Sequence, residues 1–412
     1  MAGLGVLAAG VTSAATSADL WAPAGPLPGR LDAPVFALAI DPTNGRHVLA
    51  GTEAGAILSS TDGGATWRTA VIRLGRGVAA LAFDPSQPSV VVAGTRGAGV
   101  WSSADGGRTW RQQPGTDSRT VRAFAFAGGV TLAGSDRGVL SSHDGARWSP
   151  AGLTQVRVSA LAAWTEPDGT PLLAAGGDAT QGGEPLPLFV SIDAGQTWAV
   201  APGVRGSGAA VAVAGSSMVT ALSPPATPDG ALLMATNGGV FATPDRGATW
   251  QQLTGSGVLP GTGFAGVGTA PNRPDRLYVA SDGGGSERGG VWASGDGGAR
   301  FVALAPPEPE VTALAVSGDD PPRLVAATFR PADHAVVLWT YRDAGGQPVG
   351  AATLPARAAS PRAPAAPRLP AGGPGWRAVL AQPETPYAAV GVVALLVVVA
   401  ALAAHIRRGG FR

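Results

Sequence analysis

Residues 60–67 read STDGGATW, and close variants of this stretch return five more times along the chain. The Asp-Gly-Gly core predicts a tight turn, because glycine adopts positive φ at little cost. The Thr-Trp pair that follows favours a strand carrying a large buried ring. The repeated aspartates are Asp62, Asp105, Asp144, Asp193, Asp245 and Asp296, separated by 43, 39, 49, 52 and 51 residues.

The segments between these turns repeat as well. An apolar strand such as VAALAF (78–83) precedes a polar turn, and a second strand such as SVVVAG (89–94) ends in Ala-Gly. After a glycine-rich loop comes GVWSS (99–103), then the aspartate turn, and then a fourth strand opened by Thr-Trp. Four short strands in each period of about 40–50 residues are typical of a β-propeller blade.

The number of blades follows from the two ends of the repeat. Residues 311–329 repeat the first two strands, and residues 335–346 supply a third strand with Asp343 in register but no following tryptophan. We predict that Trp21 opens the missing fourth strand, which gives an all-β propeller of seven blades closed between first and last. Such closure removes free sheet edges. A six-bladed ring ending at Phe301 is the alternative.

The repeated aspartates are interpreted as structural. A calcium loop needs several oxygen ligands, whereas each turn here offers one carboxylate among glycines. The carboxylate can accept backbone N–H groups of its own turn. The chain has no cysteine and only four histidines, none spaced as a ligand pair, so we expect no metal site and no cofactor. The aromatic residues that complete the six turns are Trp67, Trp110, Trp148, Trp198, Trp250 and Phe301.

The pattern Ser/Thr-x-Asp-x-Gly-x-Thr-Trp resembles the Asp-box, or BNR, repeat, and Ser191–Trp198 matches it in full. Six copies in register over residues 20–347 make the resemblance specific. Families that carry the repeat include sialidases, xyloglucan-cleaving glycosidases, sortilin-type receptors and photosystem II assembly factors. The resemblance implies that each box is a structural hairpin on the periphery of the propeller, away from the ligand.

A catalytic function is the less favoured interpretation of the sequence. The sialidases that the chain resembles use three arginines, a tyrosine nucleophile assisted by a glutamate, an acidic proton donor and an Arg-Ile-Pro-like motif. The residues before Asp62 contain no such motif, and residues 19–347 contain only two tyrosines, Tyr278 and Tyr341. Tyr278 lies in an apolar strand and is predicted to pack in the core. We assign no catalytic residue; a sialidase-like hydrolase and a membrane-protein assembly factor remain the alternatives to a binding module.

The loops between second and third strands are predicted to lie on the face opposite the aspartate turns. Because loops on a rigid scaffold are common binding positions, this face is the expected site for an unidentified protein or glycan ligand. Its candidate residues are Glu53, Arg96, Asp136, Arg137, Asp178, Glu184, Asn237, Asp282, Glu287, Arg288, Arg330, Asp333 and His334.

The two ends of the chain predict an anchored protein. Residues 348–386 are rich in proline and alanine and read as an extended linker. Residues 387–405 are predicted to span a membrane, and the arginines of the tail at 406–412 place that end in the cytoplasm. Residues 1–18 read as a possible remnant of an export signal, which would put the propeller, residues 19–347, outside the cell. The net charge of +1 gives no reason to expect nucleic acid.

Overall fold

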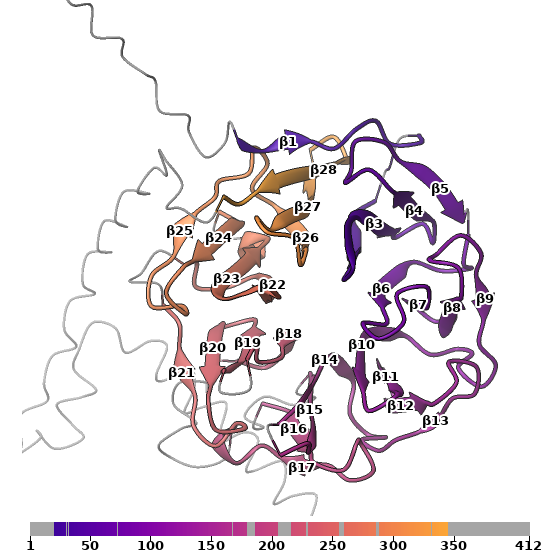
Figure 1. The fold of residues 1–412 in the computed structure, drawn as a ribbon, viewed down its shortest axis with the longest axis vertical. Coiled ribbons are helices and arrows are strands. Elements are labelled where there is room, and N and C mark those ends of the chain that lie inside the picture. The colour runs from indigo at the N-terminus through magenta and orange to yellow at the C-terminus, as the bar shows by residue number, and fades with distance from the viewer. Residues whose placement is uncertain are drawn as a thin grey trace, which may run out of the picture. The chain divides into compact units, whose positions relative to one another are not determined.

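The computed structural model describes residues 20–344, apart from positions 30, 32, 72, 167, 179–185, 205–215, 228–229, 255–258, 286–287 and 331. The described strands form seven four-stranded antiparallel sheets, which stand as blades around a central opening (Figure 1). The prediction of a seven-bladed all-β propeller is confirmed, and the six-bladed alternative is wrong.

Each blade begins with its innermost strand and runs outward. Blades 1 to 3 consist of β2 (Val35–Asp41), β3 (Asn44–Thr52), β4 (Ile57–Ser60), β5 (Arg68–Val71); β6 (Val78–Phe83), β7 (Val91–Thr95), β8 (Val100–Ser103), β9 (Arg111–Gln112); and β10 (Val121–Ala127), β11 (Val130–Ser135), β12 (Gly138–Ser142), β13 (Ser149–Pro150). The short outermost strands match the position of the predicted Thr-Trp strands.

Blades 4 to 6 repeat the same order, with short 3₁₀ turns η2 (Pro202–Val204) and η4 (Gly283–Gly285) in their connections. They consist of β14 (Val158–Thr165), β15 (Pro171–Gly177), β16 (Leu188–Ser191), β17 (Ala199–Val200); β18 (Val219–Ser223), β19 (Leu232–Thr236), β20 (Gly239–Thr243), β21 (Gln251–Gln252); and β22 (Phe264–Ala270), β23 (Arg273–Ser281), β24 (Gly290–Ser294), β25 (Val302–Ala303).

Blade 7 is assembled from both ends of the ring. Strands β26 (Val311–Val316), β27 (Arg323–Arg330) and β28 (Ala335–Arg342) are joined by β1 (Ala22–Pro23), which pairs antiparallel with β28. Trp21, directly before β1, is only 5% exposed, and its indole N–H donates to the Leu304 carbonyl at 2.9 Å. The ring is therefore closed by the segment that the sequence predicted.

The core is divided among the contacts between blades. Each neighbouring pair of blades shares an apolar cluster of buried side chains. Between blades 7 and 1, for example, Leu58 and Trp67 pack in one cluster with Val325 and Leu338. Because such a cluster also joins the last blade to the first, the apolar packing continues around the whole ring.

Several sequence predictions fall outside the described residues. These are the possible export signal, the linker at 348–386, the membrane span at 387–405 and the tail at 406–412. Among the residues that the structure describes, no helix has the length and apolar character needed to cross a bilayer.

Candidate functional site

The aspartate turns form hydrogen-bonded units within themselves. In blade 1, Asp62 Oδ1 accepts the Thr66 backbone N–H at 2.9 Å and the Ser60 hydroxyl at 2.8 Å. The Trp67 indole N–H donates to the Gly64 carbonyl at 3.1 Å and closes the turn. The side-chain and backbone hydrogen bonds from Thr66 lower the pKa of Asp62 to about 2. The carboxylate is thus engaged inside its own hairpin.

The same contacts recur in the other turns. Asp105, Asp193 and Asp245 each accept the backbone N–H and the hydroxyl of a threonine four residues on. The two shorter or altered turns keep part of the pattern: Asp144 accepts the Arg147 N–H at 2.8 Å, and Asp296 accepts the Arg300 N–H at 2.9 Å. No group of three or more His, Cys, Asp or Glu residues suited to a metal ion occurs among the described residues.

Asp343 has a different environment from the six turn aspartates. It is buried, and its Oδ2 atom accepts the Arg276 Nε–H and the Tyr278 hydroxyl, each at 2.6 Å. Burial, and then the nearby Asp343 carboxylate, raise the pKa of Tyr278 above its usual range. Asp343 therefore ties blade 7 to blade 6 instead of organising a hairpin.

Both tyrosines of the ring are buried. Tyr278 is completely buried, which agrees with its predicted place in the core, and Tyr341 is 3% exposed. The Tyr341 ring lies 5.0 Å from that of Trp21, inside the apolar cluster between blades 6 and 7. Neither tyrosine side chain lines the central opening of the ring. Their positions suit packing at the ring closure.

The candidate residues after the second strands lie on one face, which we call the loop face. Strands within each blade are antiparallel, so these loops lie at the opposite end from the aspartate turns. Glu53 and Arg96 form an ion pair at 3.1 Å that joins blades 1 and 2, and Arg96 lies over the Phe36 ring at 5.1 Å. Arg330 pairs with Asp333 at 2.8 Å. The structure thus brings together the two members of each of these ion pairs.

Most of the other candidates bind neighbouring backbone or a single partner. Asp136 accepts the Thr120 N–H at 3.1 Å, Asp178 accepts from Arg157 at 3.1 Å, and Asn237 accepts the Ser217 N–H at 2.9 Å. Asp282 accepts the Gly284 N–H at 2.8 Å, Arg137 contacts the Ser118 carbonyl at 3.5 Å, and His334 lies edge-on to Phe329. Arg288 is exposed, while Glu184 and Glu287 lie outside the described residues.

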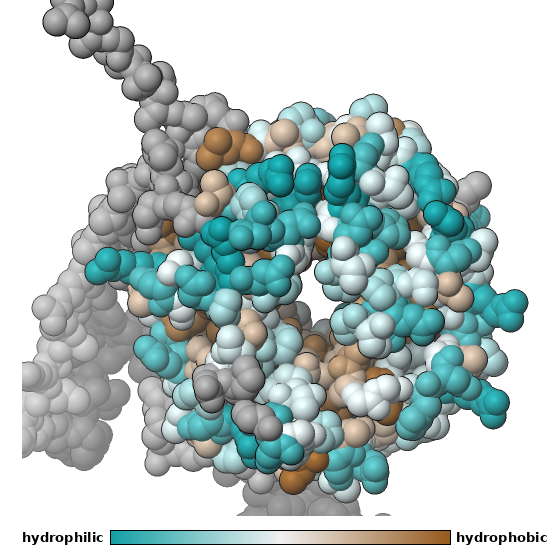
Figure 2. Space-filling model, in the orientation of Figure 1, coloured by the Kyte–Doolittle hydropathy of each residue, from teal (hydrophilic) through white to brown (hydrophobic). Residues whose placement is uncertain are grey.

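A cavity of about 330 Å³ occupies the centre of the ring and is lined by the innermost strands of all seven blades. Figure 2 shows the opening from one face, where hydrophilic residues predominate. The lining is made chiefly of alanine, leucine and phenylalanine, and among the described residues that form it Arg122 is the one ionisable side chain. Sequence reasoning missed this residue.

Arg122 belongs to a repeated structural position. In every blade the pairing between first and second strands shifts at the second residue of the innermost strand, which forms a β-bulge there. All seven of these residues line the cavity. We call them the bulge ring: Phe36, Ala79, Arg122, Ser159, Thr220, Ala265 and Thr312.

The bulge ring lies at the loop-face end of the cavity. The residue before Arg122, Val121, pairs with Ser135, which directly precedes the loop residue Asp136. Two bulge hydroxyls bond to the next blade: Ser159 donates to the Val219 carbonyl at 2.6 Å, and Thr312 donates to the Val35 carbonyl. Polar bulge residues can therefore link neighbouring blades.

Comparison with known proteins supports the fold. No family model and no curated protein matches the chain. An ancestral GH74 enzyme is similar in structure, with a TM-score of 0.56 and 15% identity over 77% of this chain and 47% of that chain. YCF48 bound to D1 peptide gives a TM-score of 0.55 and 17% identity over 79% of this chain and 97% of that chain. YCF48 from Cyanidioschyzon merolae gives a TM-score of 0.53 and 14% identity over 78% of this chain and 98% of that chain. The chain thus spans about half of the GH74 enzyme and nearly all of YCF48.

Proposed function

We propose that the chain is a non-catalytic binding module whose loop face takes a protein or glycan ligand. The supporting observation is Phe36, which is 39% exposed at the cavity mouth with Arg96 over its ring. Exposed aromatic and arginine side chains are enriched at binding surfaces. Met218, 36% exposed and bridged in backbone to Asp178, adds a second apolar group on this face.

The buried tyrosines favour the hypothesis of a non-catalytic binding module over that of a sialidase-like hydrolase. A tyrosine nucleophile must reach the substrate and be activated by a neighbouring base. Tyr278 instead donates to Asp343, and Tyr341 packs against Trp21. Burial raises the pKa of Tyr341, which opposes formation of a phenolate.

A membrane-protein assembly factor is the second candidate. It is favoured by the extent of the likeness to YCF48, because the alignment covers 97% of a protein solved with a bound D1 peptide. On this reading the loop face holds a segment of a membrane protein.

The membrane part of the proposal rests on residues 387–405, with the propeller outside the cell and the C-terminus in the cytoplasm. Protease added to intact cells should remove the propeller. Full protection of the propeller would contradict this orientation.

Hydrolysis is the direct test of the non-catalytic reading. The chain should turn over no substrate in a panel of fluorogenic glycosides that includes sialosides and xyloglucan oligosaccharides. Hydrolysis that is abolished by Tyr341→Phe would establish the hydrolase instead.

The location of the ligand can be tested by photocrosslinking in cells. A crosslinking amino acid at Asn237, on the loop face, should capture the ligand. The matched position is Arg108, which is exposed in an aspartate turn at the opposite end of its blade and should give no adduct. Adducts from Arg108 alone would contradict the assignment of the face.

A further inference from the structure

Arg122 is a cation without a partner in the described part of the chain. Its Nη1 atom is buried and makes no hydrogen bond, and Arg122 forms no ion pair with a described residue. Buried polar groups are nearly always hydrogen-bonded, because leaving one unsatisfied costs free energy. Three other arginines of the loop-face end, Arg96, Arg157 and Arg330, do have acidic partners. An unpartnered cation facing a cavity suggests an anionic ligand.

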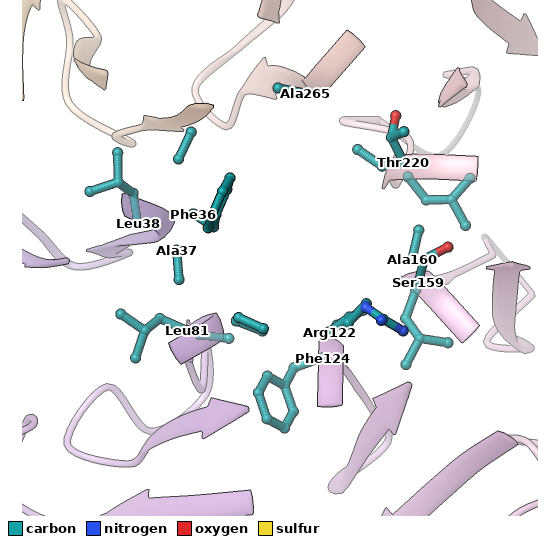
Figure 3. Close-up of a pocket in the computed structure, with 18 of the residues that line it drawn as sticks. Phe36, Ala37, Leu38, Leu81, Arg122, Phe124, Ser159, Ala160, Thr220 and Ala265 are labelled. Atoms are coloured by element: carbon teal, nitrogen blue, oxygen red, sulfur yellow. The ribbon is translucent and has the colours of Figure 1, made fainter. Parts of the chain in front are cut away.

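Three consecutive residues of the bulge ring are polar. Arg122, Ser159 and Thr220 come from the consecutive blades 3, 4 and 5, and the Thr220 hydroxyl is also buried without a hydrogen-bond partner. In Figure 3 the Arg122 side chain extends from β10 toward Ser159, and Thr220 lies beyond Ser159 on the same side. Two unsatisfied polar groups therefore line one arc of the cavity.

The opposite side of the cavity is mainly apolar, and its one polar bulge residue, Thr312, has its hydroxyl bonded to the Val35 carbonyl. Phe36, Leu38 and Leu81 lie across the opening from Arg122 and Thr220 (Figure 3). An occupant that satisfies both sides needs an anionic head and an apolar body. A single arginine compensates one negative charge, and its planar fork matches a carboxylate.

We propose that the central cavity binds a small amphiphilic monocarboxylate, with its head on Arg122 and its aliphatic body against Phe36, Leu38 and Leu81. The Thr220 hydroxyl is a further donor for the head. This site is distinct from the macromolecular ligand of the loop face, although the two meet at Phe36. Its occupation fills the cavity just behind that face.

Calorimetric titration of the full chain with octanoate, and with octanamide as its neutral isostere, tests the head group. Octanoate should bind saturably at one site. The affinity of octanamide should be lower by at least about tenfold, because a hydrogen bond to a charged group contributes about 1.5–3 kcal/mol. Equal binding of the two compounds, or no binding of octanoate, would overturn the proposal.

Variants separate the roles of the two sides. Arg122→Met should abolish the preference for octanoate without lowering the Tm, since Arg122 makes no hydrogen bond or ion pair with a described residue. Arg157→Met, on the loop face, is the matched control and should leave the preference intact. Ala265→Phe should block both compounds, because Phe36 shows that a bulge position accepts this side chain. Unchanged octanoate binding in Arg122→Met would refute the site.

Two further results complete the test. If Arg122→Met melts much lower, Arg122→Lys decides: retained preference for octanoate supports the site, and its loss with the ring intact refutes it. Absence of octanoate binding together with loop-face crosslinks from Asn237 would refute the cavity site alone. Octanoate binding without those crosslinks would refute only the loop-face function.

Discussion

The aspartates that follow the third strands of the blades occupy two different environments in this ring. In the hairpins the aspartate stays near the surface and accepts hydrogen bonds from its own turn, as Asp62 does. In blade 7 no Thr-Trp pair follows Asp343, and the carboxylate turns inward to Arg276 and Tyr278. A buried carboxylate needs such partners, because its desolvation is otherwise costly. The residues that follow the aspartate therefore decide its role.

The turn aspartates predict acid sensitivity. Hydrogen bonds from Thr66 lower the folded-state pKa of Asp62 to about 2, from 3.8. In Asp105 burial acts in the raising direction, but the hydrogen bonds from Thr109 and its neighbours outweigh it and the pKa is again about 2. The unfolded chain therefore binds protons first, and the stabilisation is present above pH 3.8 and lost as the pH falls toward 2.

Thermal unfolding followed across this range should show a steep fall in Tm below about pH 4, in line with the ordinary aspartate pKa. The double variant Asp62→Asn, Asp105→Asn should start less stable and lose less on acidification. An identical acid dependence of the two proteins would contradict the role of these carboxylates.

At the level of single residues, the sequence predicted only part of the structure and of the candidate site. The hairpins and the core position of Tyr278 followed from local patterns. Arg122 was not found, because it is a single charged residue within the otherwise apolar strand Val121–Ala127. Its signal is visible only when the seven innermost strands are aligned at their second residue, where the other blades have Phe, Ala, Ser, Thr, Ala and Thr.

At the scale of the strand, the Ala-Gly that ends the second strand has a physical cause. A Cβ atom on Gly94 would lie 2.5 Å from the Val121 carbonyl oxygen of the next blade, and one on Gly51 would lie 2.4 Å from a Val78 methyl. The second strand approaches the next innermost strand too closely for a side chain. The repeated Ala-Gly thus reports the packing of one blade on another.

Gly94→Ala should destabilise the ring by about 1–3 kcal/mol, because overpacking forces the backbone of the next blade to shift. Gly266→Ala is the matched control, since a Cβ at that position meets nothing within 4 Å. Urea unfolding of the two variants measures the difference. Similar losses in both would show that the contact between blades is not the cause.

At the scale of the whole molecule, one short segment closes the ring. Trp21 packs against Tyr341 and donates to the Leu304 carbonyl, while Ala22 and Pro23 pair with β28. This closure could be predicted because the segment around Trp21 resembles the one after the turn of blade 3. The bulges and the cavity lining could not, because they depend on how seven separate strands converge on one axis.

Trp21→Ala should cost about 3–5 kcal/mol, as expected for truncating a large buried aromatic side chain. Leu20→Ala removes a side chain that is 43% exposed one residue away and should have little effect. Chemical denaturation of both variants tests the closure. Equal stability of Trp21→Ala and the unaltered chain would mean that the ring does not depend on this segment.

On our proposal, the cavity that the seven blades enclose takes an anionic ligand. Because the chain has no cysteine, Ala265→Cys places a single thiol in the cavity lining, where N-ethylmaleimide labelling can be timed. We predict that octanoate slows this labelling, that octanamide does so much less, and that a thiol at the exposed turn residue Ala104 is unaffected by either. A labelling rate at position 265 that octanoate leaves unchanged would contradict the account.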